Sequence, residues 1–375
     1  MQLQLAGWNE SWSELFSQQF NTADHKALQP ARVLAQHRQS YSLWTASGEA
    51  NAEVAGAFLY RASAADLPAV GDWVAVRQYS PADLAIITGV LPRKTCFSRK
   101  VSGPAPEEQV IAANIDLLFI VCGLDHDYNL RRLERYLVAA RQSGAAAIIV
   151  LNKVDLCGDI PARLEEVQAI APGTSVVAIS ATSSAAALTL LQFIAPGQTG
   201  ALVGSSGAGK STIVNQLLGT AVQTTQPTRT SDSRGRHTTT HRELFFLPHG
   251  GLILDNPGLR ELQLWSEDFY SHGASATATS SLLGHAAAVD QAFPEIEVLA
   301  ARCAFRDCSH SVEPGCSVQA ALTSGQIDAA RWRSYLKLGR ELRHAAVQLD
   351  QNLRRTEKER WKKLCKEVKR NQKRR

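Results

Sequence analysis

The sequence predicts a multidomain α/β protein that also contains an all-β domain. Between residues 31 and 100, short strand-like segments alternate with polar or Gly/Pro turns, as in a small β-barrel. From about residue 110, continuous apolar runs alternate with helical patterns, which is typical of buried parallel strands. After residue 300, three cysteines and a histidine cluster beside a segment with helical periodicity. We therefore expect a barrel, an α/β domain and a helical metal-binding domain, in that order.

Composition excludes several classes of protein. The 375 residues suffice for two or three domains, and no apolar run is long enough to span a membrane. The first residues lack a basic region followed by an apolar core, so we expect no signal peptide. The seven cysteines do not form a pattern typical of a secreted disulfide framework. We expect a cytoplasmic protein with no membrane partner.

Basic charge is concentrated at the C-terminus. Residues 354–375 carry a net charge of +9, whereas the whole chain carries +5. The tail, residues 351–375, therefore suits a polyanion such as RNA. A solvated helical end that only aids solubility is the alternative.

The N-terminal hundred residues predict an arm and a barrel. The arm, residues 1–30, contains Trp8 and Trp12 at a spacing that fits a short amphipathic helix, with a loosely ordered segment as the alternative. Residues 31–100 predict a five-stranded OB-fold, which binds nucleic acid in many proteins or serves as a packing module. Its strands are expected at residues 32–36, 40–44, 53–60, 72–77 and 85–91. Residues 98–109, rich in Gly and Pro, predict a linker.

The α/β domain, residues 108–270, contains a phosphate-binding signature. Residues 204–211 read G-x-x-x-x-G-K-S, between a strand-like segment and a helical one. Gly204 and Gly209 allow a tight turn beside phosphate oxygens, Lys210 can reach the outer phosphates, and Ser211 can hold Mg²⁺. A glycine-rich turn that binds nothing is the alternative.

A second motif follows the buried strand at residues 145–151. Asn152-Lys153-Val154-Asp155 reads N-K-x-D. The carboxylate of Asp155 can accept hydrogen bonds from the ring N–H and the amine of guanine, whereas adenine would leave it unpaired in a dry site. The Lys153 stem can lie over the base, and Asn152 can tie neighbouring loops together. Ser180 and Ala181 end the next strand, where a backbone N–H can meet the guanine oxygen.

Two further segments complete a nucleotide site. Asp255 and Gly258 form D-x-x-G after a strand, which offers a carboxylate to Mg²⁺ and an N–H to a γ-phosphate. Residues 220–241 are polar, rich in Thr and long enough for a switch loop, and they contain His237 and Thr239.

A metal site is predicted at C-x4-C-x-H-x5-C. Cys303, Cys308, His310 and Cys316 supply three thiolates and one imidazole, which is the donor set of a closed, structural Zn²⁺ site. Unrelated buried cysteines are the alternative. We expect one zinc in a helical domain over residues 271–350, of which 271–288 look like an insertion.

The order of the nucleotide motifs is rotated relative to a Ras-like GTPase, because N-K-x-D and Ser-Ala precede the P-loop, the switch threonine and D-x-x-G. The chain resembles the circularly permuted GTPases, and most closely the RsgA (YjeQ/EngC) family of ribosome-small-subunit-dependent GTPases, over residues 31–340. Residues 129–140, 235–240 and 303–316 carry the resemblance beside the motifs. It implies an N-terminal OB-fold, a central permuted GTPase and a C-terminal zinc domain.

The resemblance also implies a function. We expect a monomeric GTP hydrolase that binds GTP, GDP, the small (30S) ribosomal subunit and its rRNA, acts in late small-subunit maturation, and is stimulated by ribosomes. Leu259 stands where Ras-like enzymes have a water-orienting Gln, so intrinsic hydrolysis should be slow. His237 matches the switch histidine proposed to position the water in similar families. Its alternative role is contact with RNA or solvent.

The expected site residues follow from these motifs. The catalytic residues are His237 and Lys210, and the Mg²⁺ ligands are Ser211, Asp255 and Thr239, with Thr238 and Thr240 as alternatives to Thr239. The GTP-binding residues are Asn152, Lys153, Asp155, Ser180, Ala181, Gly204, Ser205, Ser206, Gly207, Ala208, Gly209, Lys210, Ser211, Thr212, Thr239 and Gly258.

Two other functions compete with this one. The first is an RNA-binding assembly module that holds GTP or GDP with negligible turnover, which the missing Gln favours. The second is a P-loop kinase or ATPase, which Asn152 and Asp155 argue against.

Overall fold

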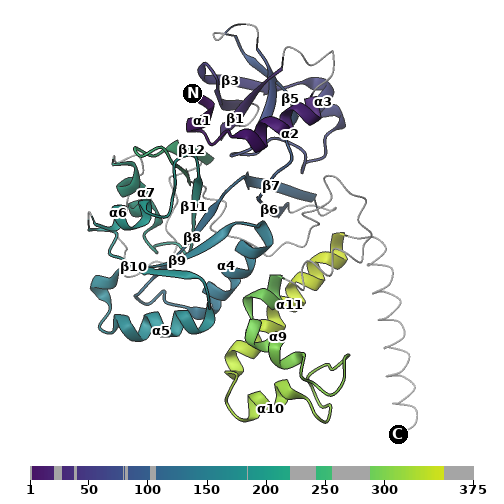
Figure 1. Cartoon of the computed structure of the whole chain (residues 1–375), viewed down its shortest axis with the longest axis vertical. Coiled ribbons are helices and arrows are strands. Elements are labelled where there is room, and N and C mark those ends of the chain that lie inside the picture. The colour runs from purple at the N-terminus through teal and green to yellow at the C-terminus, as the bar shows by residue number, and fades with distance from the viewer. Residues whose placement is uncertain are drawn as a thin grey trace. The chain divides into compact units, whose positions relative to one another are not determined.

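The structure, a computed structural model, describes residues 2–20, 28–37, 40–78, 80, 83–101, 107–183, 185–219, 242–255 and 288–349 (Figure 1). The chain divides into two compact units. Unit 1 comprises Met1–Val101 and Glu107–Leu262, and unit 2 comprises Ser102–Pro106 and Gln263–Arg375. The predicted bounds of the arm, the barrel, the α/β domain, the helical domain and the tail stay predictions. The predicted insertion, apart from residue 288, and the basic tail lie outside the described residues.

Five strands of unit 1 close into a barrel. They follow the order β1-β2-β3-β5-β4, and β4 pairs back onto β1. All neighbours are antiparallel except β3 and β5. This closed five-stranded arrangement confirms the predicted OB-fold. The strands are β1 (Leu28–Gln36), β2 (Tyr41–Thr45), β3 (Gly48–Val54), β4 (Trp73–Arg77) and β5 (Ala85–Val90).

The strand predicted at residues 53–60 is wrong in its second half. β3 ends at Val54, and α3 (Gly56–Arg61) follows it. Two apolar residues at the end of the predicted strand face solvent on this helix, because Leu59 is 54% exposed and Tyr60 is 93% exposed. Composition alone did not reveal which side of the chain these residues face.

The N-terminal segment packs on the barrel as helix. It forms α1 (Gln2–Leu5) and α2 (Glu10–Phe20), so the helical alternative holds. Trp12 is buried beside Trp73 of β4, and Trp8 packs edge-to-face on the same ring at 4.8 Å between centroids. Burial of each aromatic side chain of this size contributes about 2 kcal/mol to stability. The two tryptophans therefore hold the segment on the barrel.

The linker predicted at residues 98–109 is wrong at its described ends, residues 98–101 and 107–109. β6 (Cys96–Val101) and β7 (Glu107–Ala113) pair as an antiparallel hairpin. Phe97 and Val110 are buried on it. The Gly and Pro residues that indicated a linker fall within residues 102–106, outside the described residues.

The central sheet follows the order β10-β9-β8-β11-β13-β12. Its strands are parallel from β10 to β13, and β12 is antiparallel to β13. β12 also pairs with β1, so the central sheet and the barrel form one eleven-stranded sheet. These strands are β8 (Leu117–Gly123), β9 (Ala146–Asn152), β10 (Ser175–Ala178), β11 (Thr199–Val203), β12 (Arg242–Phe246) and β13 (Leu252–Asp255).

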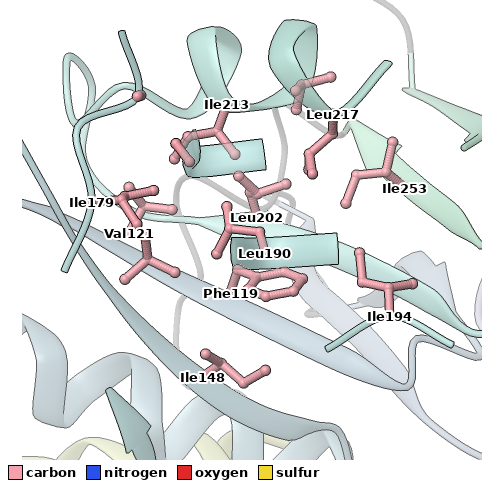
Figure 2. Close-up of a cluster of buried hydrophobic side chains, with 14 of the residues drawn as sticks. Phe119, Val121, Ile148, Ile179, Leu190, Ile194, Leu202, Ile213, Leu217 and Ile253 are labelled. Carbon is pink, nitrogen blue, oxygen red and sulfur yellow. The ribbon is translucent and has the colours of Figure 1, made fainter. Parts of the chain in front are cut away.

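Helices cover the central sheet. α6 (Ala185–Leu191) and α7 (Lys210–Leu218) pack together on one face, where Leu190 and Ile213 meet Phe119 and Leu202 of the strands (Figure 2). α4 (Leu130–Ser143) contacts β8 and β9, and α5 (Ile160–Ile170) contacts β10. A short 3-10 helix, Val154–Leu156, follows β9. Successive side chains of a strand point to opposite faces of the sheet, so the apolar strands present apolar side chains to the helices on both faces.

Arg32 of β1 links the barrel to the strand that leads into the P-loop. Its Nη2 donates to the Asn114 carbonyl at 3.1 Å and to Thr199 Oγ1 at 2.8 Å, and its Nη1 donates to the Ala6 carbonyl. The guanidinium is buried, and burial lowers its pKa to about 10. A buried cation with this many acceptors fixes the three segments relative to one another.

Unit 2 is helical in its described part. α9 (Pro294–Ala300), α10 (Ser317–Thr323) and α11 (Ala329–Leu349) share a small core that includes Phe293, Ile296 and Val318. Arg331 of α11 lies over the Phe293 ring at 4.5 Å and pairs with Glu295. None of the helices in the described ranges is long and apolar enough to cross a bilayer.

Candidate functional site

The predicted P-loop connects β11, whose residues are all buried, to α7. Gly204 and Gly209 have φ angles of 148° and 100°. A Cβ at Gly204 would lie 2.2 Å from the Val121 carbonyl oxygen, and one at Gly209 would lie 2.1 Å from Asn152 Nδ2. Both positions therefore require glycine for space as well as for conformation.

Lys210 points back into the loop. The side chain is buried, and its Nζ donates to the Gly204 carbonyl at 2.8 Å and to the Ser205 carbonyl. An ammonium held on loop carbonyls is placed to meet a phosphate at the start of α7. Among the other loop residues, Ala208 is buried, Ser205, Ser211 and Thr212 are half-buried, and Ser206 and Gly207 are exposed.

Asn152 joins three of the predicted motifs. Its side chain is 1% exposed. Nδ2 donates to the Ala208 carbonyl of the P-loop at 2.8 Å, and Oδ1 accepts from the Ala181 backbone N–H at 2.8 Å. One amide therefore fixes the spacing between the side expected to hold the base and the side expected to hold the phosphates. This is the tie between loops that the N-K-x-D motif predicts.

Asp155 lies beside the Ser-Ala segment. Ser180 Oγ donates to Asp155 Oδ1 at 2.6 Å, and it lies 2.8 Å from Thr182 Oγ1. The backbone N–H of Val154 donates to the Ile179 carbonyl at 3.3 Å, which keeps the two segments together. The carboxylate thus stands at the carboxyl edge of β9 and β10, where ligands bind in open α/β sheets.

Two aspartates that sequence reasoning missed lie in the same region. Asp125 Oδ2 accepts from Lys153 Nζ at 2.6 Å, and Asp127 accepts from Ser205 Oγ. Burial alone would raise the pKa of Asp125, but the bond and charge of Lys153 lower it below its ordinary value. A signal was present in the sequence, since carboxylates directly after a buried parallel strand face the ligand edge of the sheet.

Asp255 ends β13, next to β11 in the sheet. Its side chain is half-buried. The pairing of Ala201 with Leu254 brings Asp255 to the edge where the P-loop begins. His237, Thr239 and Gly258 lie outside the described residues.

The metal-ligand set converges in unit 2. The ligand atoms of Cys303, Cys308, His310 and Cys316 all lie within 4.8 Å of one another. Cys303 Sγ and Cys316 Sγ are 3.8 Å apart, and each lies 3.5 Å from His310 Nδ1. His310 has a φ of 57°, which turns the chain back toward Cys316. The types of the ligand atoms and the distances between them are those of a metal site.

Comparisons with known proteins agree with this geometry. A family model described as RsgA GTPase matches residues 90–265. Small ribosomal subunit biogenesis GTPase RsgA of Opitutus terrae is 46% identical over 363 residues, which are 94% of each chain. The protein of the same name from Leptospira interrogans is 44% identical over 317 residues, 84% of this chain and 83% of that one.

Two solved structures share the fold. YjeQ from Thermotoga maritima matches with a TM-score of 0.59 and 23% identity, over 84% of this chain and 98% of that chain. YloQ, described as a circularly permuted GTPase, matches with a TM-score of 0.57 and 19% identity, over 86% of this chain and 98% of that chain.

The rotated motif order, the barrel and the P-loop sheet define a circularly permuted P-loop GTPase. The length and identity of the matches to curated relatives then give the family. The chain belongs to the RsgA family of GTPases.

Proposed function

We propose that this GTPase binds the small ribosomal subunit and its rRNA as a cytoplasmic monomer and acts in late maturation of that subunit. The observation that carries the nucleotide part is the pair of Asn152 hydrogen bonds, which join the N-K-x-D motif to the P-loop and to the Ser-Ala segment. The ribosomal part is supported by the relatives, which are named as small ribosomal subunit biogenesis GTPases. The basic tail suits rRNA, which is a polyanion.

In this proposal the base and the phosphates have separate binding residues. Asp155 accepts from guanine, the Lys153 stem covers the ring, and Ala181 N–H meets the guanine oxygen. Lys210 and the loop N–H groups hold the phosphates, and Gly258 N–H meets the γ-phosphate. The remaining predicted GTP-binding residues belong to the same nucleotide site. They are Ser180, Gly204, Ser205, Ser206, Gly207, Ala208, Gly209 and Thr212.

Magnesium fits the residues proposed for it. Ser211 is the second residue of α7, directly after the P-loop lysine, and Asp255 ends β13, next to β11. Two hard oxygen donors therefore come from one edge of the sheet. Thr239 is the proposed third ligand. The ion, when bound, neutralises charge on the β- and γ-phosphates. The attacking water is oriented by His237 in this proposal, because Leu259 has no polar atom for that task.

Zinc is the metal proposed for the Cys3His group. With Zn–S of about 2.3 Å and Zn–N of about 2.05 Å, a tetrahedral site places its sulfurs about 3.8 Å apart and each sulfur about 3.5 Å from the nitrogen. The Cys303–Cys316, Cys303–His310 and Cys316–His310 distances match these values. Four protein ligands leave no open position, so the proposed role is structural.

The test is the rate of GTP hydrolysis with and without purified small ribosomal subunits. We expect strong stimulation by the subunits for the unmodified protein, and hydrolysis near zero for His237→Ala, which should still bind GTP. Unchanged turnover in His237→Ala would overturn the role of His237. Binding of GTP with no stimulation would instead favour the binding module with negligible turnover.

A further inference from the structure

The loop that follows β8, residues 124–128, contacts both halves of the nucleotide site. Asp125 pairs with Lys153 on the base side, and Asp127 bonds Ser205 on the phosphate side. The loop is also fixed internally, because Asp125 Oδ1 accepts from the Asp127 N–H at 3.1 Å. Tyr128 anchors its end through a 2.8 Å bond from its hydroxyl to Glu166 Oε2. The loop is therefore held by hydrogen bonds within itself and at its end.

Asp127 has a second partner, the guanidinium of Arg132. Arg132 Nη1 donates to Asp127 Oδ1, while Ser205 Oγ donates to Asp127 Oδ2. The two carboxylate oxygens thus have different partners, one on α4 and one on the P-loop. Asp127 is 18% exposed, so its charge is only partly screened by water.

The position of Arg132 in its helix is unusual. It lies in the first turn of α4, where its backbone N–H donates to the Asn129 cap at 3.1 Å. The helix dipole disfavours a cation there, and this turn contains no acidic residue. Burial would lower the pKa of Arg132, but the bond and charge of Asp127 raise it above its ordinary value. The pairing with Asp127 thus accounts for a cation at an unfavourable helix position.

We propose that Asp127 and Arg132 are positioning residues of the phosphate-binding loop, with Arg132 neutralising the carboxylate that holds Ser205. This inference rests on the proposed binding of GTP at the P-loop. A bare carboxylate bonded to the loop would repel the phosphates, and the repulsion would grow with the number of phosphates. Asp127 can hold Ser205 beside a polyanion only because Arg132 cancels its charge.

The test measures the dissociation constants of guanosine, GDP·Mg²⁺ and GTP·Mg²⁺ by calorimetry. The variants are Arg132→Ala, Asp127→Asn and the double substitution in the full chain. Arg135→Ala is the matched control, because it removes the same charge from the next turn of the same helix. Circular dichroism checks that each variant is folded.

We expect Arg132→Ala to weaken GTP binding by at least about five-fold, GDP binding by less, and guanosine binding hardly at all. Adding Asp127→Asn should restore GTP binding to within about two-fold of the unmodified protein, because the unpaired charge is gone. Arg135→Ala should bind all three ligands normally.

Equal losses for guanosine, GDP and GTP in Arg132→Ala would overturn the inference, because they would indicate a general structural role. A double variant as weak as Arg132→Ala alone would also overturn it. If the unmodified protein bound neither GTP nor GDP, the proposed nucleotide function itself would fail. That result is separate from both outcomes above.

Discussion

The nucleotide site and the proposed metal centre of this chain are built in opposite ways. The nucleotide site gathers side chains from segments between Asp125 and Asp255, which an eleven-stranded sheet holds in place. The metal centre takes its ligands from Cys303 to Cys316, and no strand occurs in the described part of its unit. The first site is therefore formed by the fold, and we expect it to persist without ligand. The second forms part of a small core, and we expect that core to need its ion.

Loss of the metal should have the largest effect. Structural zinc contributes about 10–16 kcal/mol in zinc-finger peptides, so chelation or Cys316→Ser should unfold residues 288–342. Serine can still cap α10, as the Cys316 sulfur does toward the Gln319 N–H, so the substitution isolates the role of the thiolate. Hydrogen exchange should show lost protection in unit 2 and unchanged protection in unit 1.

The matched control for the metal is Cys157→Ser, which changes a half-buried free thiol of unit 1. This variant should keep the proposed zinc and the protection of unit 2. If the chelated protein kept full protection over residues 288–342, the contrast between the two sites would disappear.

The second largest effect is expected at Gly209. Gly209→Ala places a methyl group against Asn152 Nδ2, so it breaks the tie between the motifs and should weaken GTP binding about 100-fold. The control is Gly219→Ala, since Gly219 also has a positive φ, of 67°, but nothing lies within 4 Å of its added Cβ. That variant should lose about 1 kcal/mol of stability and keep its GTP affinity. Equal affinities of the two variants would contradict the prediction.

A smaller effect is expected from a half-buried carboxyl of unit 2. Burial and the charge of Glu297 raise the pKa of Asp290 to about 7, and the Tyr335 hydroxyl lies between them at 3.5 and 3.3 Å. Since the folded pKa exceeds the ordinary value of 3.8, this contribution to stability is complete below about pH 4 and is lost as the pH rises through 7.

Asp290→Asn removes that dependence on pH. After a discount for its partial exposure, the substitution should stabilise unit 2 by about 1 kcal/mol at pH 8 relative to the unmodified protein, with no gain at pH 4. Denaturant unfolding of the full chain, followed by exchange in unit 2, measures the difference. A gain of equal size at both pH values would show that titration of Asp290 is not its cause.

The sequence predicted local features well, because each motif is short and its chemistry depends on neighbouring residues. The P-loop glycines, the N-K-x-D strand exit and the Cys3His spacing are all of this kind. The identity of the barrel was predictable for the same reason, since short alternating strands repeat within about seventy residues.

The features that the sequence did not predict depend on tertiary packing rather than on neighbouring residues. The strand predicted at residues 53–60 depended on which side apolar residues face, and that is decided by tertiary packing. Arg32 meets Thr199 across 167 positions of chain, and Asp127 meets Ser205 across 78. No periodicity reports such contacts, so the role of Arg32 emerged only from the fold. The position of Asp127 after a buried strand indicated the ligand edge of the sheet, but not its partner Ser205.

The rotated strand order also sets the sequence of events during synthesis. β8, β9 and β10 leave the ribosome before β11, although β11 lies between β8 and β13 in the finished sheet. The growing chain therefore presents its base-binding edge first, with one side of β8 still open to mispairing. The P-loop then completes the pocket from its centre. β12, which pairs with β1, is made next, and β13 is made last and lies between β11 and β12. A nascent chain that stopped before β13 would carry every motif up to the P-loop and still lack the strand that joins β11 to β12.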